Sequence, residues 1–280
     1  MTYEELAARV VTWAQTQPAI RAVINVGSRA RAEYPADRWS DLDLIVFTTD
    51  RPHYAADPAW LHKFGTIWVT YQEATAPGDA EWYVVYEGGL KLDVILLQVD
   101  HPALALADLL PRYPYQEAFA RGIKVLYDQQ GSARTISAQP HTPDAPPSAA
   151  EFDHVISGFL MAAVTTAKFI TRGDFYRAQR WFASDLHVHL LTMIRWHALG
   201  RDRWYGARFI EQWADPRVLA ALPQTFALYE RASLQTALLA ILDLFWLIGM
   251  ESAARFDLTY PTDTHDNIRA VIVSSFAEST

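Results

Sequence analysis

The hydrophobic positions in the first half of the chain recur mostly with the short period of strands. Six apolar runs, β-branched or alternating, predict strands at residues 22–26, 41–47, 66–71, 82–86, 90–97 and 123–127. Helical spacing predicts helices at residues 4–17, 104–110 and 116–120. Glu87-Gly88-Gly89 separates two of the strand runs and predicts a hairpin, so we expect the sheet to be at least partly antiparallel.

After residue 130 the pattern changes to a polar, proline-rich segment and then to helical spacing alone. Four prolines fall between residues 140 and 147, which is typical of an exposed connection between domains. Helical spacing then predicts helices at residues 151–170, 174–197, 207–214, 233–255 and 263–276. We therefore predict an α+β N-terminal domain, a mixed sheet with flanking helices, at residues 1–135, a linker at 136–148, and an all-α helical bundle at 149–280.

Composition and charge narrow the class of protein. With 24 Lys and Arg against 32 Asp and Glu, the formal net charge of −8 argues against a nucleic-acid surface and suits a cationic partner. The chain has no cysteine, which excludes disulfides and thiolate metal sites. The apolar run 237–250 contains Asp243 and is shorter than the ~20 residues of a membrane helix, and the first residues lack the layout of a signal peptide. We therefore expect a cytoplasmic protein with no membrane span.

The most informative stretch joins the end of one predicted strand to the start of the next. Gly27-Ser28 ends the run 22–26, and twelve residues later the chain enters Asp41-Leu42-Asp43. A Gly-Ser turn after a strand can direct backbone N–H groups and the Ser28 hydroxyl at a phosphate. Asp41 and Asp43 leave the same face of a strand, where their repulsion favours a bound cation. Asp-x-Asp alone is also typical of a polar strand edge, but its combination with the turn predicts a phosphate and metal site.

A third carboxylate, Asp93, stands among apolar residues in the predicted strand 90–97. A buried acid without a partner destabilises a fold, so this position calls for an explanation. One explanation is an edge strand whose acid faces solvent. The other is a site in which Asp93 joins Asp41 and Asp43 to bind Mg²⁺, a cation that prefers oxygen ligands and nucleotide phosphates.

These residues together resemble a known signature. Gly27-Ser28, the twelve-residue spacing, Asp41-Leu42-Asp43 and a later strand acid resemble the DNA polymerase β-like nucleotidyltransferase superfamily. More closely, residues 27–31, 39–47 and 92–94 are similar to the bacterial aminoglycoside 6-adenylyltransferases, which inactivate streptomycin. The similarity continues in the second half with Ala183-Ser184-Asp185 and residues 193–196.

The resemblance implies a reaction and a set of roles. AMP would pass from ATP to a hydroxyl of a small cationic acceptor, most simply an aminoglycoside such as streptomycin, which would confer antibiotic resistance. Gly27 and Ser28 would hold the nucleotide phosphates, and Asp41 and Asp43 would bind two Mg²⁺ ions. Asp93 would complete the metal site or act as general base. Arg29 would contact a phosphate, unless it is simply an exposed arginine.

The second half offers candidates for which a structural role is an equal alternative. Lys168 and Arg172 share a helix face and, with Arg177 and Arg180, form either a clamp for the triphosphate or a solvated basic surface. Four acids could bind a cationic acceptor and three tryptophans could enclose it, or else these residues belong to the surface and core. They are Asp153, Asp174, Asp185 and Glu211, and Trp181, Trp196 and Trp204. We expect structural or surface roles for His154, His187, His189 and His197.

Other functions remain compatible with the sequence. The chain could adenylylate a lincosamide or a protein, or be a non-catalytic nucleotide-binding protein of the same fold. The oligomeric state, the nucleotide base and the modified hydroxyl are not specified by the sequence.

Overall fold

The computed structural model describes residues 1–31, 36–113, 119, 122–131, 133, 136, 145–201 and 207–277. They form two compact units, Met1–Thr142 and Pro143–Thr280. The division falls inside the proline-rich segment 136–148 that we predict as the linker. Most of the helix predicted at residues 116–120 lies outside the described residues, as does Trp204.

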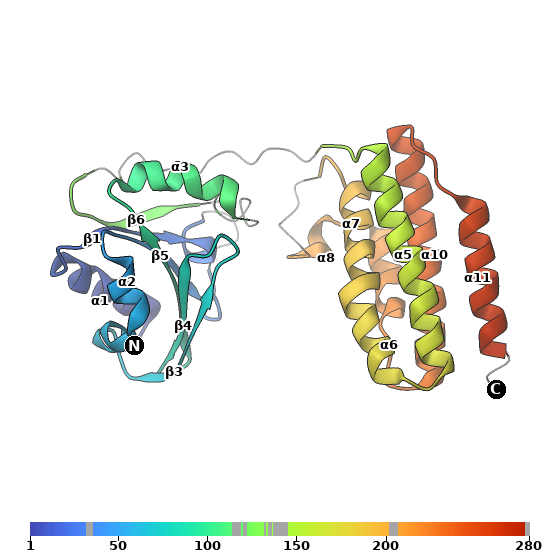
Figure 1. The fold of residues 1–280 in the computed structure, drawn as a ribbon, viewed down its shortest axis with the longest axis horizontal. Helices are drawn as coiled ribbons and strands as arrows, with labels where there is room; N and C mark the ends of the chain where they lie inside the picture. Colours follow the sequence, from blue (N-terminus) through green and yellow to red (C-terminus); the bar gives the residue numbers. More distant parts are fainter. Residues whose placement is uncertain are drawn as a thin grey trace. The chain divides into compact units, whose positions relative to one another are not determined.

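The first unit is built on a six-stranded sheet (Figure 1). In spatial order the strands are β3 (Ile67–Ala74), β4 (Ala80–Tyr86), β5 (Leu90–Gln98), β2 (Leu42–Thr48), β1 (Ile20–Val26) and β6 (Lys124–Asp128). β2 and β5 run parallel, and the other neighbouring pairs are antiparallel. The predicted mixed sheet and the hairpin of β4 and β5 are therefore confirmed.

Helices flank this sheet on both faces. On one face, the apolar side chains of α1 (Tyr3–Gln15), α2 (Arg51–Ala56) and the 3-10 helix Pro58–Lys63 pack into a core with β2, β4 and β5. On the other face, α3 (Pro102–Arg112) packs over β1, β2 and β5. α1 begins with a capping box in which Thr2 and Glu5 satisfy each other's backbone N–H groups. We did not predict α2 or the 3-10 helix from the sequence.

The face under α3 changes character along β2 and β5. Ile45 and Phe47 of β2 and Leu97 of β5 belong to the core that α3 covers. Asp43 and Asp93 point to the same face because they are separated from these residues by even numbers of positions. The polar end of this face, beyond the core under α3, is therefore where the predicted site residues lie.

The second unit is helical throughout its described residues. Its elements are α5 (Ala149–Thr171), α6 (Phe175–Trp181), a turn of π-helix (Phe182–Leu186), α7 (His187–His197), α8 (Ile210–Trp213), α9 (Pro216–Ala221), a 3-10 turn (Leu222–Thr225), α10 (Arg231–Phe256) and α11 (Thr262–Ala277). They enclose one apolar core. The predicted helical bundle is confirmed, although the single helix expected at residues 174–197 is interrupted by the π-helical turn and α9 was not predicted.

Two helices of this unit, α5 and α10, are long and apolar enough to cross a membrane by length and composition alone. In each, 56% of the most apolar window is buried inside the protein, and core helices of soluble proteins pass the same test. The apolar run 237–250 lies within α10, where Ile241, Leu242 and Phe245 are fully buried. Asp243 is exposed and accepts a hydrogen bond of 2.7 Å from Arg269 Nε. The run is therefore a core helix in this unit, as predicted.

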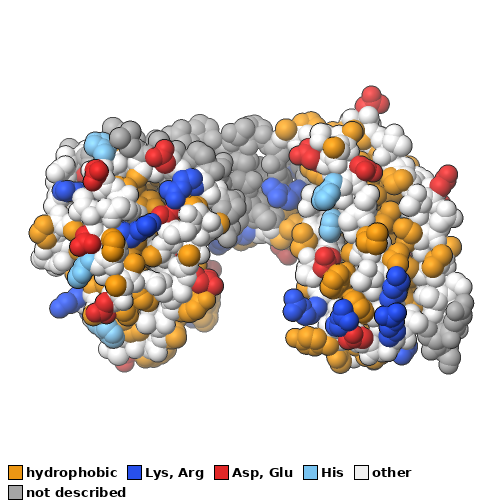
Figure 2. All heavy atoms as spheres, in the orientation of Figure 1, with side chains coloured by type: hydrophobic (Ala, Val, Ile, Leu, Met, Phe, Trp, Pro, Cys, Tyr) orange, Lys and Arg blue, Asp and Glu red, His pale blue; other side chains and the backbone are white. Residues whose placement is uncertain are grey.

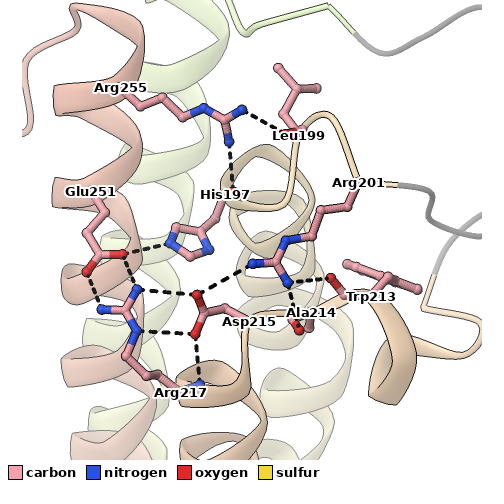
Figure 3. A network of polar contacts seen from close by, with 9 residues as sticks. All are labelled: His197, Leu199, Arg201, Trp213, Ala214, Asp215, Arg217, Glu251 and Arg255. Carbon is pink, nitrogen blue, oxygen red and sulfur yellow. Dashed lines mark hydrogen bonds and ion pairs between the residues drawn. The ribbon is translucent and has the colours of Figure 1, made fainter.

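A polar network connects α7, α9 and α10 (Figure 3). Glu251 accepts hydrogen bonds of 2.7 and 2.9 Å from the two terminal nitrogens of Arg217, and it lies 2.7 Å from His197 Nε2. Hydrogen bonds from Arg217, followed by that of His197, lower the pKa of Glu251. Asp215 caps α9 and forms ion pairs with Arg217 and Arg201. His197 thus has a structural role, as we expected.

A half-buried histidine, His187, and a buried one, His265, make the stability of the second unit depend on pH. His187 Nδ1 lies 2.9 Å from the Phe182 carbonyl, and the ring stacks on Phe226. His265 is 2% exposed, with Nδ1 3.0 Å from the Tyr260 hydroxyl. Burial lowers the pKa of both rings from the usual 6.5, so the folded unit favours the neutral form. Their contribution is therefore complete above about pH 6.5 and is lost as the pH falls through the lower folded-state pKa values.

We expect the melting temperature of the protein to fall as the pH is lowered from about 7 to about 5. The fall should be smaller in His265→Gln, which cannot gain a proton, than in the control His62→Gln, whose histidine is exposed. Circular dichroism melts across this pH range measure the difference. Parallel pH profiles for the two variants would contradict the assignment.

Candidate active site on the sheet

The site begins where β1 ends in a tight turn. Gly27, with φ +69°, opens the single 3-10 turn Gly27–Arg29. The register places Val26 beside Asp43 on β2, and a Cβ atom on Gly27 would overlap Oδ2 of Asp43. Glycine is therefore required twice, for its backbone conformation and for the approach of the carboxylate. Asn25 Nδ2 fixes both strand ends by donating to the carbonyls of Asp43 at 2.9 Å and Val26 at 3.1 Å.

The predicted acids lie on neighbouring strands. Asp43 of β2 and Asp93 of β5 are register partners in the parallel pair. Leu42, Leu44 and Leu92 are buried on the opposite face, so strand alternation directs all three acids to one face. Asp93 is more enclosed than Asp41, with 16% of its side chain exposed against 36% for Asp41. The structure thus brings Asp43 and Asp93 side by side, as the sequence led us to expect.

A lysine that we did not assign to the site joins two of these acids. Lys91 Nζ donates to Asp41 Oδ2 at 2.9 Å and to Asp93 Oδ2 at 2.8 Å. Lys91 precedes Asp93 by two residues on β5, so alternation puts both side chains on the same face. That spacing was the signal in the sequence, but the partner strand was needed to recognise it.

Burial and charge act against each other at this cluster. Burial raises the pKa of Asp93, and the hydrogen bond and charge of Lys91 offset this only in part. Burial by itself would lower the pKa of Lys91, but the hydrogen bonds and charges of Asp93 and Asp41 outweigh it and the pKa rises. Lys91 is therefore a protonated ammonium at neutral pH, and it is the positive charge that the carboxylates share.

The donor chemistry of the cluster suits a hard cation. Among the described residues, Oδ1 of Asp93 is buried and has no hydrogen-bond partner, which leaves a carboxylate oxygen able to ligate Mg²⁺. With Lys91 between Asp41 and Asp93, however, no three His, Asp or Glu side chains in the described part of the chain are gathered to hold one metal ion. The residues are of the right type and on one face, and their convergence on a metal stays a prediction.

The polar face continues from Asp93 across β4 to β3. Tyr83 is the register partner of Asp93, and its ring stacks on Tyr71 with 6.1 Å between centroids. The Tyr83 hydroxyl is hydrogen-bonded to Glu81, a half-buried carboxylate whose pKa is raised by that burial. The Tyr71 hydroxyl donates to Glu73 at 2.7 Å. We had not singled out these four residues, although the predicted hairpin would have placed Tyr83 beside Asp93.

Ser28 and Arg29 differ in their surroundings. Ser28 is buried in the turn next to Gly27. The Arg29 guanidinium lies 3.7 Å from the centre of the Tyr3 ring and donates to the carbonyls of Ser40 and Asp37, each at 3.0 Å. These contacts hold the segment that leads into Asp41. They give Arg29 a positioning role, and its predicted contact with a phosphate stays a prediction.

The candidates in the second unit are arranged as its surface and core. Lys168 is exposed near the end of α5, and Figure 2 shows Lys and Arg side chains gathered where α5 ends and α6 begins. Arg177 of that region pairs with Asp174 at 3.6 Å. Trp181 and Trp196 pack against the core residues Phe169 and Phe152, and Asp185 accepts a hydrogen bond from the Ser184 hydroxyl. A contact between Lys168 and a nucleotide stays a prediction.

We expect Gly27→Ala to lower the free energy of unfolding by about 1–3 kcal/mol, since a side chain there requires an unfavourable φ and overlaps Asp43. Gly89→Ala is the matched control, because Gly89 has φ +79° but open space around the added Cβ. Urea unfolding should therefore show a larger loss for Gly27→Ala than for Gly89→Ala. Equal losses would mean that backbone strain alone requires the glycine and that the approach of Asp43 does not.

Comparison with known proteins assigns the chain to a family. The family model described as streptomycin adenylyltransferase matches residues 1–274. An aminoglycoside 6-adenylyltransferase of Campylobacter jejuni is 24% identical over 268 residues, which are 90% of this chain and 88% of that protein. A Bacillus subtilis aminoglycoside 6-adenylyltransferase is 25% identical over 207 residues, covering 69% and 68% of the two chains.

A crystal structure of an aminoglycoside 6-adenyltransferase from Bacillus subtilis aligns with 99% of each chain at 18% identity and a TM-score of 0.45. The family assignment therefore rests on the sequence matches, which span both units of the chain. The glycine turn and the strand acids at the polar end of the sheet lie within the matched region. The chain thus belongs to the streptomycin adenylyltransferase family and is an adenylyltransferase.

Proposed function

We propose that the chain transfers AMP from ATP to a hydroxyl group of a cationic aminoglycoside, most simply streptomycin. The observation that carries the proposal is the meeting of Gly27, Asp43 and Asp93 at the polar end of the sheet. A glycine turn backed by carboxylates supports binding of a nucleoside triphosphate together with its divalent cation. The names of the Campylobacter and Bacillus relatives support the choice of an aminoglycoside as acceptor.

The transfer forms one bond and breaks one. The acceptor hydroxyl oxygen attacks the α-phosphorus of ATP in line, and the bond from that phosphorus to the leaving pyrophosphate breaks. In this proposal Gly27 and Ser28 hold the phosphates, and Asp41 and Asp43 hold Mg²⁺. Asp93 either completes the ligand set or accepts the proton of the hydroxyl. Two Mg²⁺ ions, when bound, offset charge on the attacking and leaving oxygens.

Charge on the sheet supports a cationic acceptor. From Asp93 towards the edge strand the register places Tyr83 and then Tyr71, whose rings stack, and Glu81 and Glu73 face each other on the same two strands. Aromatic rings and carboxylates are groups that attract guanidinium and ammonium ions. The net charge of −8 would also raise the encounter rate with such an acceptor and oppose binding to nucleic acid.

We infer that the parts of the chain have separate roles. Residues 1–135 form the nucleotidyltransferase domain, 136–148 the linker, and 149–280 the acceptor-binding domain, with Lys168 contributing a charge towards the triphosphate. The proposed reaction takes place in the cytoplasm, where ATP and Mg²⁺ are available.

A pyrophosphate-release assay with ATP and Mg²⁺ tests the proposal. The acceptors are streptomycin, other aminoglycosides, spectinomycin and lincosamides, each added separately. Release with streptomycin is the expected result, and release with another aminoglycoside alone would change the substrate but keep the reaction. Release only with a lincosamide would overturn the proposal in favour of a different acceptor class. If none of the acceptors causes release, the proposal is overturned in favour of a non-catalytic nucleotide-binding protein.

A further inference from the structure

Lys91 has no role in the proposed reaction, although it contacts two of the acids that the reaction uses. Its ammonium bridges Asp41 and Asp93 through one oxygen of each carboxylate, at 2.9 and 2.8 Å. The ring of Tyr83 on the neighbouring strand lies 5.7 Å from the same nitrogen. About a third of the Lys91 side chain is exposed, 38%, so the ammonium is enclosed but keeps a path to solvent.

The three acids and Lys91 carry a formal charge of −2 on one face of the sheet. Carboxylates that face one another repel, and an opposite charge within hydrogen-bond distance is the simplest compensation. An ammonium is a compact point charge with three donors, so it satisfies two carboxylates at once. Lys91 therefore compensates the negative charges of Asp41 and Asp93, as a bound metal ion would.

The proposed function assigns Asp41 to Mg²⁺ and gives Asp93 as a further ligand or as the general base. A carboxylate oxygen whose lone pair accepts from an ammonium is less available to a metal ion, and two cations close together repel each other. Lys91 and a divalent cation are therefore competitors for Asp41 and Asp93. Because part of the Lys91 side chain is exposed to solvent, the ammonium can move away from the two carboxylates.

We propose that Lys91 is the internal counter-ion of the site, which holds Asp41 and Asp93 together in the metal-free protein and releases them when a divalent cation binds. This inference rests on the proposed function, which supplies the cation. It makes Lys91 a positioning residue that sets the metal concentration at which the site fills.

The test compares Lys91→Met with wild type in two measurements that need no turnover. Calorimetric titration with Mn²⁺ in the absence of ATP should show about tenfold tighter binding for Lys91→Met, because the competing charge is gone. In EDTA the same variant should melt at a lower temperature than wild type, and Mn²⁺ should close that gap. Lys91→Arg keeps the charge and should stay close to wild type, and Lys63→Met, which removes an exposed lysine of the same unit, is the matched control.

Further variants separate failure of this inference from failure of the proposed function. Asp43→Asn should abolish the Mn²⁺ binding that Lys91→Met enhances. If binding depends on Asp43 but is equal or weaker in Lys91→Met, the counter-ion role is overturned and the metal site stands. If no Asp43-dependent binding occurs in wild type or in Lys91→Met, both the metal site and the counter-ion role are overturned.

A measurement on the wild type covers the case in which Lys91→Met does not fold. Mn²⁺ should increase labelling of Lys91 by an amine-specific reagent relative to Lys63, because the released side chain is more accessible. Mass spectrometry of the labelled peptides gives the ratio. A ratio unchanged by saturating Mn²⁺ would overturn the proposal.

Discussion

Replacing Asp43 with asparagine should reduce adenylyl transfer by about 10³-fold or more while the protein stays folded. Asp43 lies against Gly27 and beside Asp93, so it is the acid that joins the proposed phosphate turn to the proposed metal ligands. Asparagine keeps the shape of the side chain but removes the charge that would bind the cation. It also removes repulsion in the metal-free site, so the melting temperature should be unchanged or slightly higher.

Asp41→Asn should also reduce adenylyl transfer, but by less than Asp43→Asn does, because Asp41 is more exposed than Asp93 and is held through Lys91. Asp100→Asn is the matched control, since it removes an exposed carboxylate from the same unit. Steady-state rates with the acceptor found in the screen measure all three variants. Turnover of Asp43→Asn close to that of the control, at ordinary Mg²⁺, would contradict the metal assignment.

The second large effect is expected for Asp93→Asn, which should cut kcat by about 10²-fold or more with ATP binding retained. Asp93 has one oxygen on Lys91 and one buried oxygen without a partner among the described residues. Its burial raises its pKa, which suits a proton acceptor better than an exposed aspartate would. The measurements are kcat and the ATP dissociation constant over a range of Mg²⁺ concentrations.

The Mg²⁺ series distinguishes the two roles of Asp93. A loss of kcat that high Mg²⁺ does not restore indicates a general base. Recovery at high Mg²⁺ indicates a ligand, and the half-buried Glu81, on the neighbouring strand, is then the next carboxylate to test as the base. An unchanged rate and affinity would mean that Asp93 is an ordinary strand acid and that the three-carboxylate site is wrong.

Local pattern was sufficient to predict the strands and the direction of the acids. The period of two in a strand puts Asp41 and Asp43 on one face whatever the rest of the fold does. The same rule puts Lys91 and Asp93 on one face of β5. The structure shows that β2 and β5 are adjacent and parallel, with Asp43 opposite Asp93. This pairing depends on contacts between residues far apart in the sequence. The bridge made by Lys91 could therefore not be predicted from spacing alone.

The sequence pattern did not predict some side-chain contacts and some local features of the helices. Arg29 follows the glycine turn as a phosphate ligand would, and the pattern does not reveal its contacts with Tyr3 and the carbonyls of Asp37 and Ser40. The helix expected at residues 174–197 has the correct periodicity, which does not reveal the extra residue of the π-helical turn Phe182–Leu186. Asp215-Pro216 was a helix-start signal for α9 that we did not use.

Transfer of label from ATP carrying radioactive phosphorus at the α position is the most direct test of the central claim. With Mg²⁺ and an aminoglycoside acceptor, the wild-type protein should move the label to the acceptor, whose mass increases by one adenylyl group, and Asp43→Asn should not. Label transfer by Asp43→Asn at the wild-type rate, or none by the wild type with any aminoglycoside, would contradict it.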